Sequence, residues 1–119
     1  MERNTLDIFF KLNQEVNNIK LAILLTYLLT IQDNNNVAYL IQTATAKKFG
    51  IYITGLHKLL KQAQDNGYIT ITSIVKPAHF FYTEQDFINE YGEDAEQFYN
   101  TSTVGTQIDI NYSLIELTQ

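Results

Sequence analysis

The feature of the sequence that most constrains the fold is the stretch of residues 43–82, where two short helical patterns precede two strand-like segments. The first helical pattern, residues 43–49, begins at Thr43, whose hydroxyl can cap a helix, and ends before Gly50, which can take the left-handed conformation found after helices. After a short turn, apolar residues recur at helical spacing over residues 53–66. The stretch therefore predicts a helix, a tight turn, a second helix and a β-hairpin.

The second helical pattern has two chemically different faces. Apolar residues that recur every three or four positions predict a buried face, made up of Leu56, Leu59, Leu60 and Ala63. The polar and basic residues fall on the opposite face, which carries Thr54, His57, Lys58, Lys61 and Gln62. One face can therefore pack against a core while the other is free to contact a partner.

The strand-like segments follow a break at residues 65–67, Asp-Asn-Gly. Residues 68–74 alternate β-branched side chains and predict a strand. Residues 75–79, which contain the only proline, are expected to form the tip of the hairpin, and residues 80–82 its returning strand. Residues 37–41 predict one further short strand against this hairpin.

The helical part of this stretch resembles the pattern of winged-helix regulators from bacteria and from their plasmids and phages. The families have, in order, a small helix, Gly, an apolar residue, a capping Ser or Thr, and a basic helix ending in Gly-Leu/Tyr-Ile. The matching residues 46–69 of this chain are Ala-Lys-Lys-Phe-Gly-Ile-Tyr-Ile-Thr-Gly-Leu-His-Lys-Leu-Leu-Lys-Gln-Ala-Gln-Asp-Asn-Gly-Tyr-Ile. Two residues depart from the pattern: Tyr52 stands at the capping position, and Gly55 lies inside the second helix, where it costs about 1 kcal/mol relative to alanine. The likeness covers about residues 19–82. It implies a winged helix-turn-helix and binding of double-stranded DNA, as a transcriptional regulator such as a repressor or as an accessory DNA-transaction protein of a mobile element.

The remaining segments extend this core within a single α+β domain of residues 1–119. Residues 5–17 predict an additional N-terminal amphipathic helix. The next helix, residues 19–32, is apolar almost all round, so it needs cover on two sides, from the winged core and from either the N-terminal helix or a second protomer. Residues 83–119 are expected to form an acidic C-terminal extension that contains a helix capped by Thr83, which Gly92 can end. Residues 101–105 are expected to be a loop, and the alternation over residues 107–117 predicts a strand.

The net charge of −5 is distributed unevenly along the chain. Residues 20–82 contain six lysines and two aspartates, a net charge of +4, whereas residues 83–119 contain eight acidic residues and no lysine or arginine. A basic face on the middle segment is therefore compatible with a phosphate backbone. A solvated surface is expected for the acidic group, which lacks the alternating ligands and central glycine of a calcium loop and comprises Asp86, Glu90, Glu93, Asp94 and Glu96.

The composition limits the chemistry and the location of the chain. It contains no cysteine, so disulfides, thiolate nucleophiles and zinc fingers are excluded, and a reducing cytoplasm is the expected compartment. His57 and His79 have only Asp65 and Glu84 as nearby acids, so we expect neither an enzyme nor a cofactor nor a metal site. The longest apolar run is shorter than the roughly 20 residues that cross a bilayer, and no signal peptide precedes it, so no membrane partner is expected.

The residues expected to contact DNA fall into three groups. The second helix would enter the major groove with Ile53, Thr54, His57, Lys58, Lys61 and Gln62, the first helix would hold the DNA backbone with Lys47 and Lys48, and the hairpin tip would reach out with Lys76 and His79. Because that helix contains no arginine, sequence choice would depend on polar contacts, on contact of Ile53 with thymine methyls, and on DNA shape.

Two further expectations concern partners. A homodimer is expected, because the doubly apolar helix and the unpaired C-terminal strand both need cover. The alternative function is a winged helix that binds another protein, through its helix faces and the acidic segment, and does not bind DNA. The sequence identifies no small-molecule effector.

Overall fold

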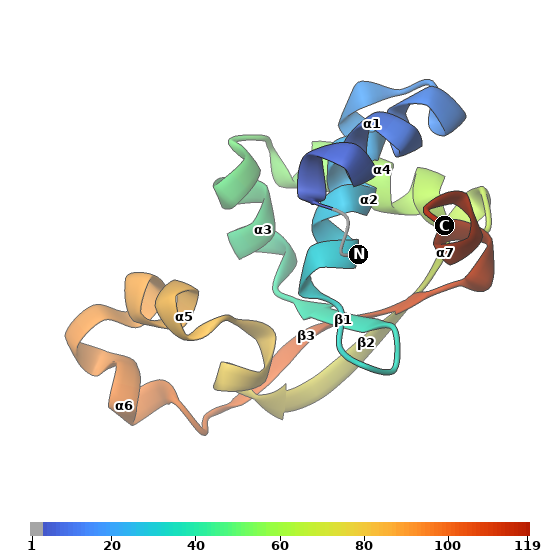
Figure 1. Ribbon diagram of the computed structural model, residues 1–119. Coiled ribbons are helices and arrows are strands. Elements are labelled where there is room, and N and C mark those ends of the chain that lie inside the picture. Colours follow the sequence, from blue (N-terminus) through green and yellow to red (C-terminus); the bar gives the residue numbers. More distant parts are fainter. Residues whose placement is uncertain (1–3) are drawn as a thin grey trace.

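The computed structural model describes residues 4–119 as an α+β fold in which helices pack on one face of a three-stranded antiparallel sheet (Figure 1). In chain order the elements are α1 (Thr5–Val16), α2 (Ile19–Ile31), β1 (Val37–Leu40), α3 (Gln42–Phe49), α4 (Ile53–Asp65), β2 (Ile69–Pro77), η1 (Ala78–Phe81), α5 (Glu84–Tyr91), η2 (Gly92–Asp94), α6 (Ala95–Phe98), β3 (Ser102–Ile110) and α7 (Tyr112–Leu117), where η denotes a short 3₁₀-helix. The strand order is β1-β3-β2. This arrangement is compatible with the winged helix that the sequence predicts.

The apolar helix α2 forms the centre of the helical layer. Asn18 caps its start by accepting a hydrogen bond from the backbone N–H of Leu21, and Leu21, Leu25 and Leu28 are fully buried. Helix α1 packs along α2 and contributes the fully buried Leu12, while α4 and β1 contact α2 as well. The same chain therefore supplies the cover on both sides of α2, and the N-terminal helix takes the place that a second protomer could have filled.

Helices α3 and α4 lie where the sequence predicts two helices joined by a short turn. Helix α3 ends at Gly50, which has a φ of 68° in the left-handed region, and α4 begins at Ile53. The prediction that Thr43 caps the first helix is wrong. The helix begins one residue earlier, its N-cap is Ile41, and no side chain caps it.

The predicted hairpin is wrong in its tip and in its returning strand. Residues 75–77 continue β2, and residues 80–82 lie in and just after η1, not in a strand. The reason is that the aromatic side chains of this segment pack across the sheet. A Cβ atom at Gly105 would overlap the ring of Phe81, and the Phe80 ring meets Tyr39 edge-on with ring centroids 4.5 Å apart. This packing turns the chain away from β2.

The strand that returns along β2 is β3, which the sequence analysis divided between a loop and an unpaired strand. It begins at Ser102 inside the expected loop, and it ends at Ile110, since the expected strand residues 112–117 form helix α7 instead. Strand β3 pairs with β1 on one side and with β2 on the other, with Ile108 opposite both Ala38 and Ile71. It is the central strand of the sheet, so its edges need no second protomer.

The residues between β2 and β3 form a separate lobe. We call residues 78–101, from η1 to the residue before β3, the acidic lobe. It contains six of the acidic residues and no lysine or arginine. Figure 1 shows α5 and α6 standing apart from α1, α2 and α4, beyond the far end of the β2–β3 ribbon. The acidic segment is thus in part an insertion between two paired strands, where the sequence predicts a C-terminal extension.

Candidate nucleic-acid interface

Helix α4 presents the two faces that its sequence predicts. Leu56, Leu60 and Ala63 are buried, while Leu59 is only half-buried. The polar residues that the sequence assigns to the opposite face are all exposed to solvent, and they are Thr54, His57, Lys58, Lys61 and Gln62. The exposed side of α4 is therefore polar and basic, and the apolar side fixes its position against the core.

A groove of about 430 Å³ lies between the start of α4, the start of α3 and the β2–β3 ribbon. Its walls include Ile53 and His57 from α4, Thr43 from α3, and Ser73 and Val104 from the ribbon. None of the residues that line it is an aspartate, glutamate, lysine or arginine. The structure thus joins two predicted site residues, Ile53 and His57, to strand residues at one concave surface.

The lysines of α4 differ in their partners. Lys61 Nζ lies 3.2 Å from Asp65 Oδ2, in an exposed pair one helical turn apart, which contributes about 0.3–0.5 kcal/mol. Lys58 is exposed and forms no ion pair within the part of the chain that the structure describes. Both side chains can reach an approaching phosphate, because an exposed pair such as Lys61–Asp65 exchanges partners readily.

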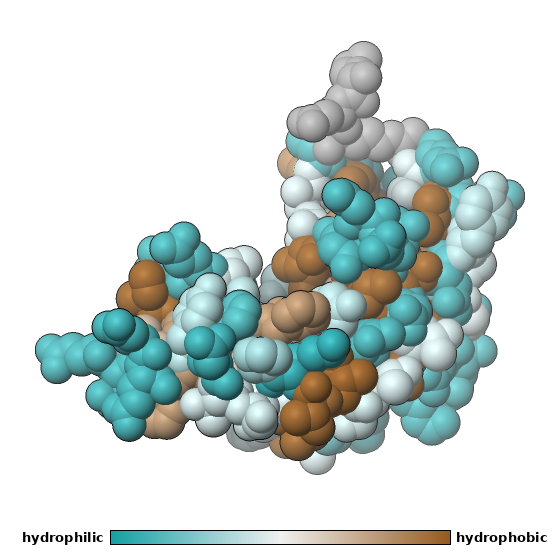
Figure 2. Space-filling view, turned by 90° about the horizontal axis from the view of Figure 1, so that it is seen from below, coloured by the Kyte–Doolittle hydropathy of each residue, from teal (hydrophilic) through white to brown (hydrophobic). Residues whose placement is uncertain are grey.

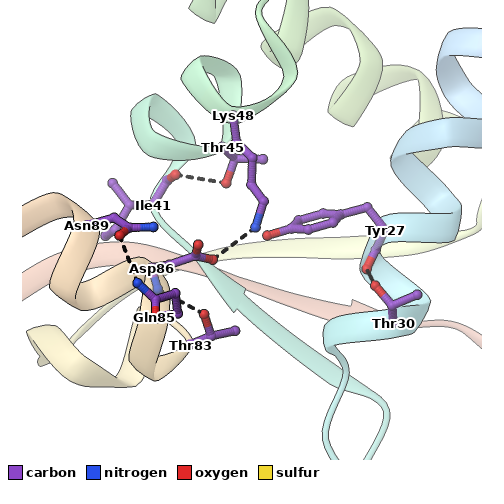
Figure 3. A network of polar contacts seen from close by, with 9 residues as sticks. All are labelled: Tyr27, Thr30, Ile41, Thr45, Lys48, Thr83, Gln85, Asp86 and Asn89. Carbon is purple, nitrogen blue, oxygen red and sulfur yellow. Dashed lines mark hydrogen bonds and ion pairs between the residues drawn. The ribbon is translucent and has the colours of Figure 1, made fainter.

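The two lysines of α3 also differ. Lys48 Nζ lies 2.9 Å from Asp86 Oδ2 of α5 and 5.4 Å from the centroid of the Tyr27 ring (Figure 3). The hydrogen bond with Asp86 is the main cause that raises the pKa of Lys48, and burial raises the pKa of Tyr27. Lys47 is exposed and lines a cavity of about 390 Å³ between α3 and α5. Lys48 therefore connects the helical layer to the acidic lobe, and its charge is already partly balanced.

The two site residues expected at a hairpin tip lie elsewhere. Lys76 is within β2, and its Nζ lies 5.5 Å from the centroid of the Phe80 ring. His79 belongs to η1, where its Nδ1 lies 2.9 Å from the carbonyl oxygen of Tyr99 and its ring stacks on the Tyr99 ring at a centroid distance of 4.1 Å. These contacts place both residues at the base of the acidic lobe, so the expectation that they extend from a tip is wrong.

Sequence reasoning missed the ribbon residues that face the groove. Ser73 and Val104 line it, but Val104 was assigned to a loop. The local sign of a strand there was a group of β-branched residues that includes Thr103, Val104 and Thr106. Gln42 was missed as well. Its Nε2 donates to Thr106 Oγ1 at 2.9 Å, and its buried Oε1 has no partner among the described residues.

The acidic lobe has a small aromatic core of its own. Phe87 is buried, with its ring centroid 4.6 Å from that of Tyr91 and 5.6 Å from that of Tyr99. Tyr91 also stacks on Phe98. Figure 2 shows that the lobe, at left, is mostly hydrophilic on the face seen from below. Its carboxylates project from a short folded segment and not from a disordered tail.

Within residues 4–119, no three His, Cys, Asp or Glu side chains come together as a metal site, and no helix has the length and hydropathy needed to span a bilayer. Comparison of the chain with protein families, with curated proteins and with solved structures gave no match.

Proposed function

We propose that this protein is a winged helix-turn-helix protein that binds double-stranded DNA with sequence selectivity. In this proposal α3 and α4 form the helix-turn-helix, α4 is the recognition helix, and the β2–β3 ribbon is the wing. The biological role would be regulation of transcription, such as repression, or an accessory part in another DNA transaction of a mobile element.

One observation carries the proposal: α4 exposes a polar, basic face beside an uncharged groove whose other wall is the ribbon. A protein that reads DNA needs cations for the phosphates and uncharged groups at the base edges. Lys58 and Lys61 supply the cations. Ile53, Thr54 and His57, near the start of the helix, supply the groups for the base edges. No acidic residue lines the groove, so no carboxylate in its wall repels an approaching phosphate.

The other residues predicted to contact DNA are expected to contribute less to binding than these. Gln62 lies further along α4, and Lys47 is exposed at the end of α3. Lys48 would have to leave Asp86 to reach a phosphate. Lys76 and His79 lie beside the acidic lobe, and we assign them the weakest contribution.

Salt-dependent binding to duplex DNA tests the proposal. A pool of random duplexes is selected for binding over several rounds, and the affinity of an enriched duplex is then measured at increasing salt concentrations. Phosphate contacts release counterions, so the logarithm of affinity should fall linearly with the logarithm of salt, with a slope of about one unit for each lysine engaged. An absence of enrichment, or affinity that does not change with salt, would contradict DNA binding.

We propose a homodimer as the DNA-bound form, in which two copies of α4 lie about 34 Å apart, one turn of DNA. Exposed apolar residues on α1 and α2 are available for such pairing, namely Leu6, Phe10, Ile19 and Ile23. Light scattering with and without the selected duplex should return the mass of two chains, and the selected sequence should be a palindrome. The mass of one chain under both conditions would remove the dimer and leave DNA binding intact.

The alternative function is a protein-binding winged helix that docks a basic partner on the acidic lobe. It is favoured by three exposed apolar side chains of the lobe, Phe80, Ile88 and Tyr99, in a segment that also contains six acidic residues. The duplex selection separates the two functions, because a protein-binding winged helix that does not bind DNA gives no enrichment over several rounds, whereas DNA binding gives an enriched duplex whose affinity falls with salt.

A further inference from the structure

The groove beside α4 continues into an exposed apolar strip on the ribbon. Val104 lines the groove and is 68% exposed, and Val75, its cross-strand partner, is 61% exposed. Because side chains alternate between the two faces of a strand, Val75 lies on the same face as Ile71, which also lines the groove. Ile53, the first residue of α4, completes the strip from the helical side. Two valines held in register and left open to water are costly unless something apolar covers them.

The polar groups of the groove are poorly suited to reading most base edges. Thr43 and Ser73 offer exposed hydroxyls, which bond to several bases without distinguishing them. No arginine or lysine lines the groove for the bidentate contact that guanine favours. The one amide in its wall, that of Gln42, is hydrogen-bonded to Thr106, and its oxygen is buried. His57 also lines the groove and can hydrogen-bond a base edge from α4, as proposed above. For the apolar part of the wall, the base feature to contact is the C5 methyl group of thymine, which lies in the major groove.

We propose, on the basis of the DNA-binding function proposed above, that this groove selects A·T-rich duplexes by covering thymine methyl groups with Ile53, Val75 and Val104. The contact removes apolar surface of the methyl and of the valines from water at the same time. Lys58 and Lys61 lie outside the groove, so their phosphate contacts add affinity without sequence preference. Each covered methyl should strengthen binding about fourfold, which corresponds to about 0.8 kcal/mol for a group of that size.

Duplexes that differ only in this methyl group test the proposal. Four duplexes of equal length are compared by fluorescence anisotropy at one salt concentration: alternating A·T, the same duplex with uracil in place of thymine, alternating G·C, and the same duplex with 5-methylcytosine in place of cytosine. The thymine duplex should bind at least about fourfold more tightly than the uracil duplex. Methylation of cytosine should strengthen binding in the same direction. The salt slope should be equal for thymine and uracil, because their phosphates are the same.

A variant of the strip connects the preference to these residues. Val75→Thr with Val104→Thr keeps the branched shape and the strand propensity but replaces one methyl of each side chain with a hydroxyl. The ratio of thymine to uracil affinity should fall towards one, while the salt slope and the melting temperature stay close to those of the native protein. Ile88→Thr on α5 is the matched control, since Ile88 is exposed in the acidic lobe, and it should leave the ratio unchanged.

The outcomes separate this inference from the proposed function. Equal affinity of the native protein for the thymine and uracil duplexes overturns methyl reading and leaves DNA binding standing. A thymine preference that persists in the double valine variant overturns the assignment to the strip. Absence of salt-dependent binding to all four duplexes and to the random pool overturns the DNA-binding function and this inference together.

Discussion

The exposed face of α4 and the acidic lobe differ both in charge and in how the fold holds them. Helix α4 is fixed by Leu56, Leu60 and Ala63, which belong to the main apolar core. The lobe has a few aromatic rings of its own, and an exposed ion pair, Lys48–Asp86, connects it to α3. The basic surface is thus built on a helix anchored in the main apolar core, and the acidic surface on an insertion with little core of its own. Substitutions should therefore act on the two surfaces in different ways.

The largest expected effect is the loss of stability when a buried side chain of α4 is removed. Leu56→Ala removes a fully buried side chain from the core and should lower the free energy of unfolding by about 2–5 kcal/mol. Ile88→Ala, at a residue 47% exposed on the lobe, should change it by less than about 0.5 kcal/mol. Urea unfolding of both variants measures the difference. Similar losses would show that the lobe contributes as much to the core as α4 does.

The next prediction separates the contribution of the α4 charges to DNA binding from the stability of the helix. Lys58→Glu with Lys61→Glu should abolish binding to a selected duplex, because two phosphate contacts are lost and each new carboxylate repels phosphate. The melting temperature should barely change, since both side chains are exposed. Anisotropy and thermal unfolding give the two quantities.

The matched control for this charge reversal is Lys20→Glu, at an exposed residue of α2 that lines a different surface pocket. It should reduce affinity far less than Lys58→Glu alone does. Native affinity and native salt dependence in the double variant would contradict the assignment of α4 as the recognition helix.

The parts of the fold that follow from local chemistry were predicted from the sequence, and the pairing of strands was not. Gly50 at the end of α3 and the Asn-Gly break after α4 are local signals, so the helix-turn-helix was placed to within about one residue. The partner of β2 depends on contacts across residues 78–101, such as Phe81 against Gly105. The aromatic residues 80–82 have as high a strand propensity as the residues of the true partner, so propensity alone could not distinguish them.

The candidate site also has one part that could be predicted from the sequence and one part that could not. The polar face of α4 follows from helical spacing, and the five residues predicted for it are all exposed. The opposite wall of the groove could not be predicted, because Val104 reaches it only through the register in which β3 pairs with β2. The pairing of Lys48 with Asp86 spans 38 positions and has no signature in the sequence. Because of this pairing, Lys48 would have to leave Asp86 to contact a phosphate.

A smaller effect tests whether the lobe repels DNA. Neutralising four of its carboxylates should strengthen binding to random duplex DNA by a factor of about two to ten at low salt, and the gain should disappear as salt screens the repulsion. The substitutions are Glu90→Gln, Glu93→Gln, Asp94→Asn and Glu96→Gln. Circular dichroism should be unchanged, since all four side chains are exposed.

The control for this neutralisation uses acids outside the lobe. Glu15→Gln with Glu116→Gln removes two exposed carboxylates from α1 and α7 and should alter binding less than Glu93→Gln with Glu96→Gln. Weaker binding after neutralisation of the lobe, with an unchanged spectrum, would mean that the lobe contacts DNA or supports the interface.

The smallest effect concerns the contact that joins the two regions. The pKa of Tyr27 is raised mainly by burial, and that of Lys48 mainly by its hydrogen bond to Asp86, so the folded state holds both protons more tightly than the unfolded state does. This stabilisation is complete below the ordinary pKa values of 10.0 and 10.5 and is lost as the pH rises through the higher folded-state values.

Tyr27→Phe should therefore flatten the loss of stability above about pH 10, whereas Tyr52→Phe, at a side chain 87% exposed, should not. At neutral pH the Lys48–Asp86 pair should contribute at most about 1 kcal/mol, because the Lys48 side chain is 48% exposed. Urea unfolding of the native protein and both variants across this pH range measures the slopes, and equal slopes would show that Tyr27 titrates in the folded protein as it does in the unfolded chain.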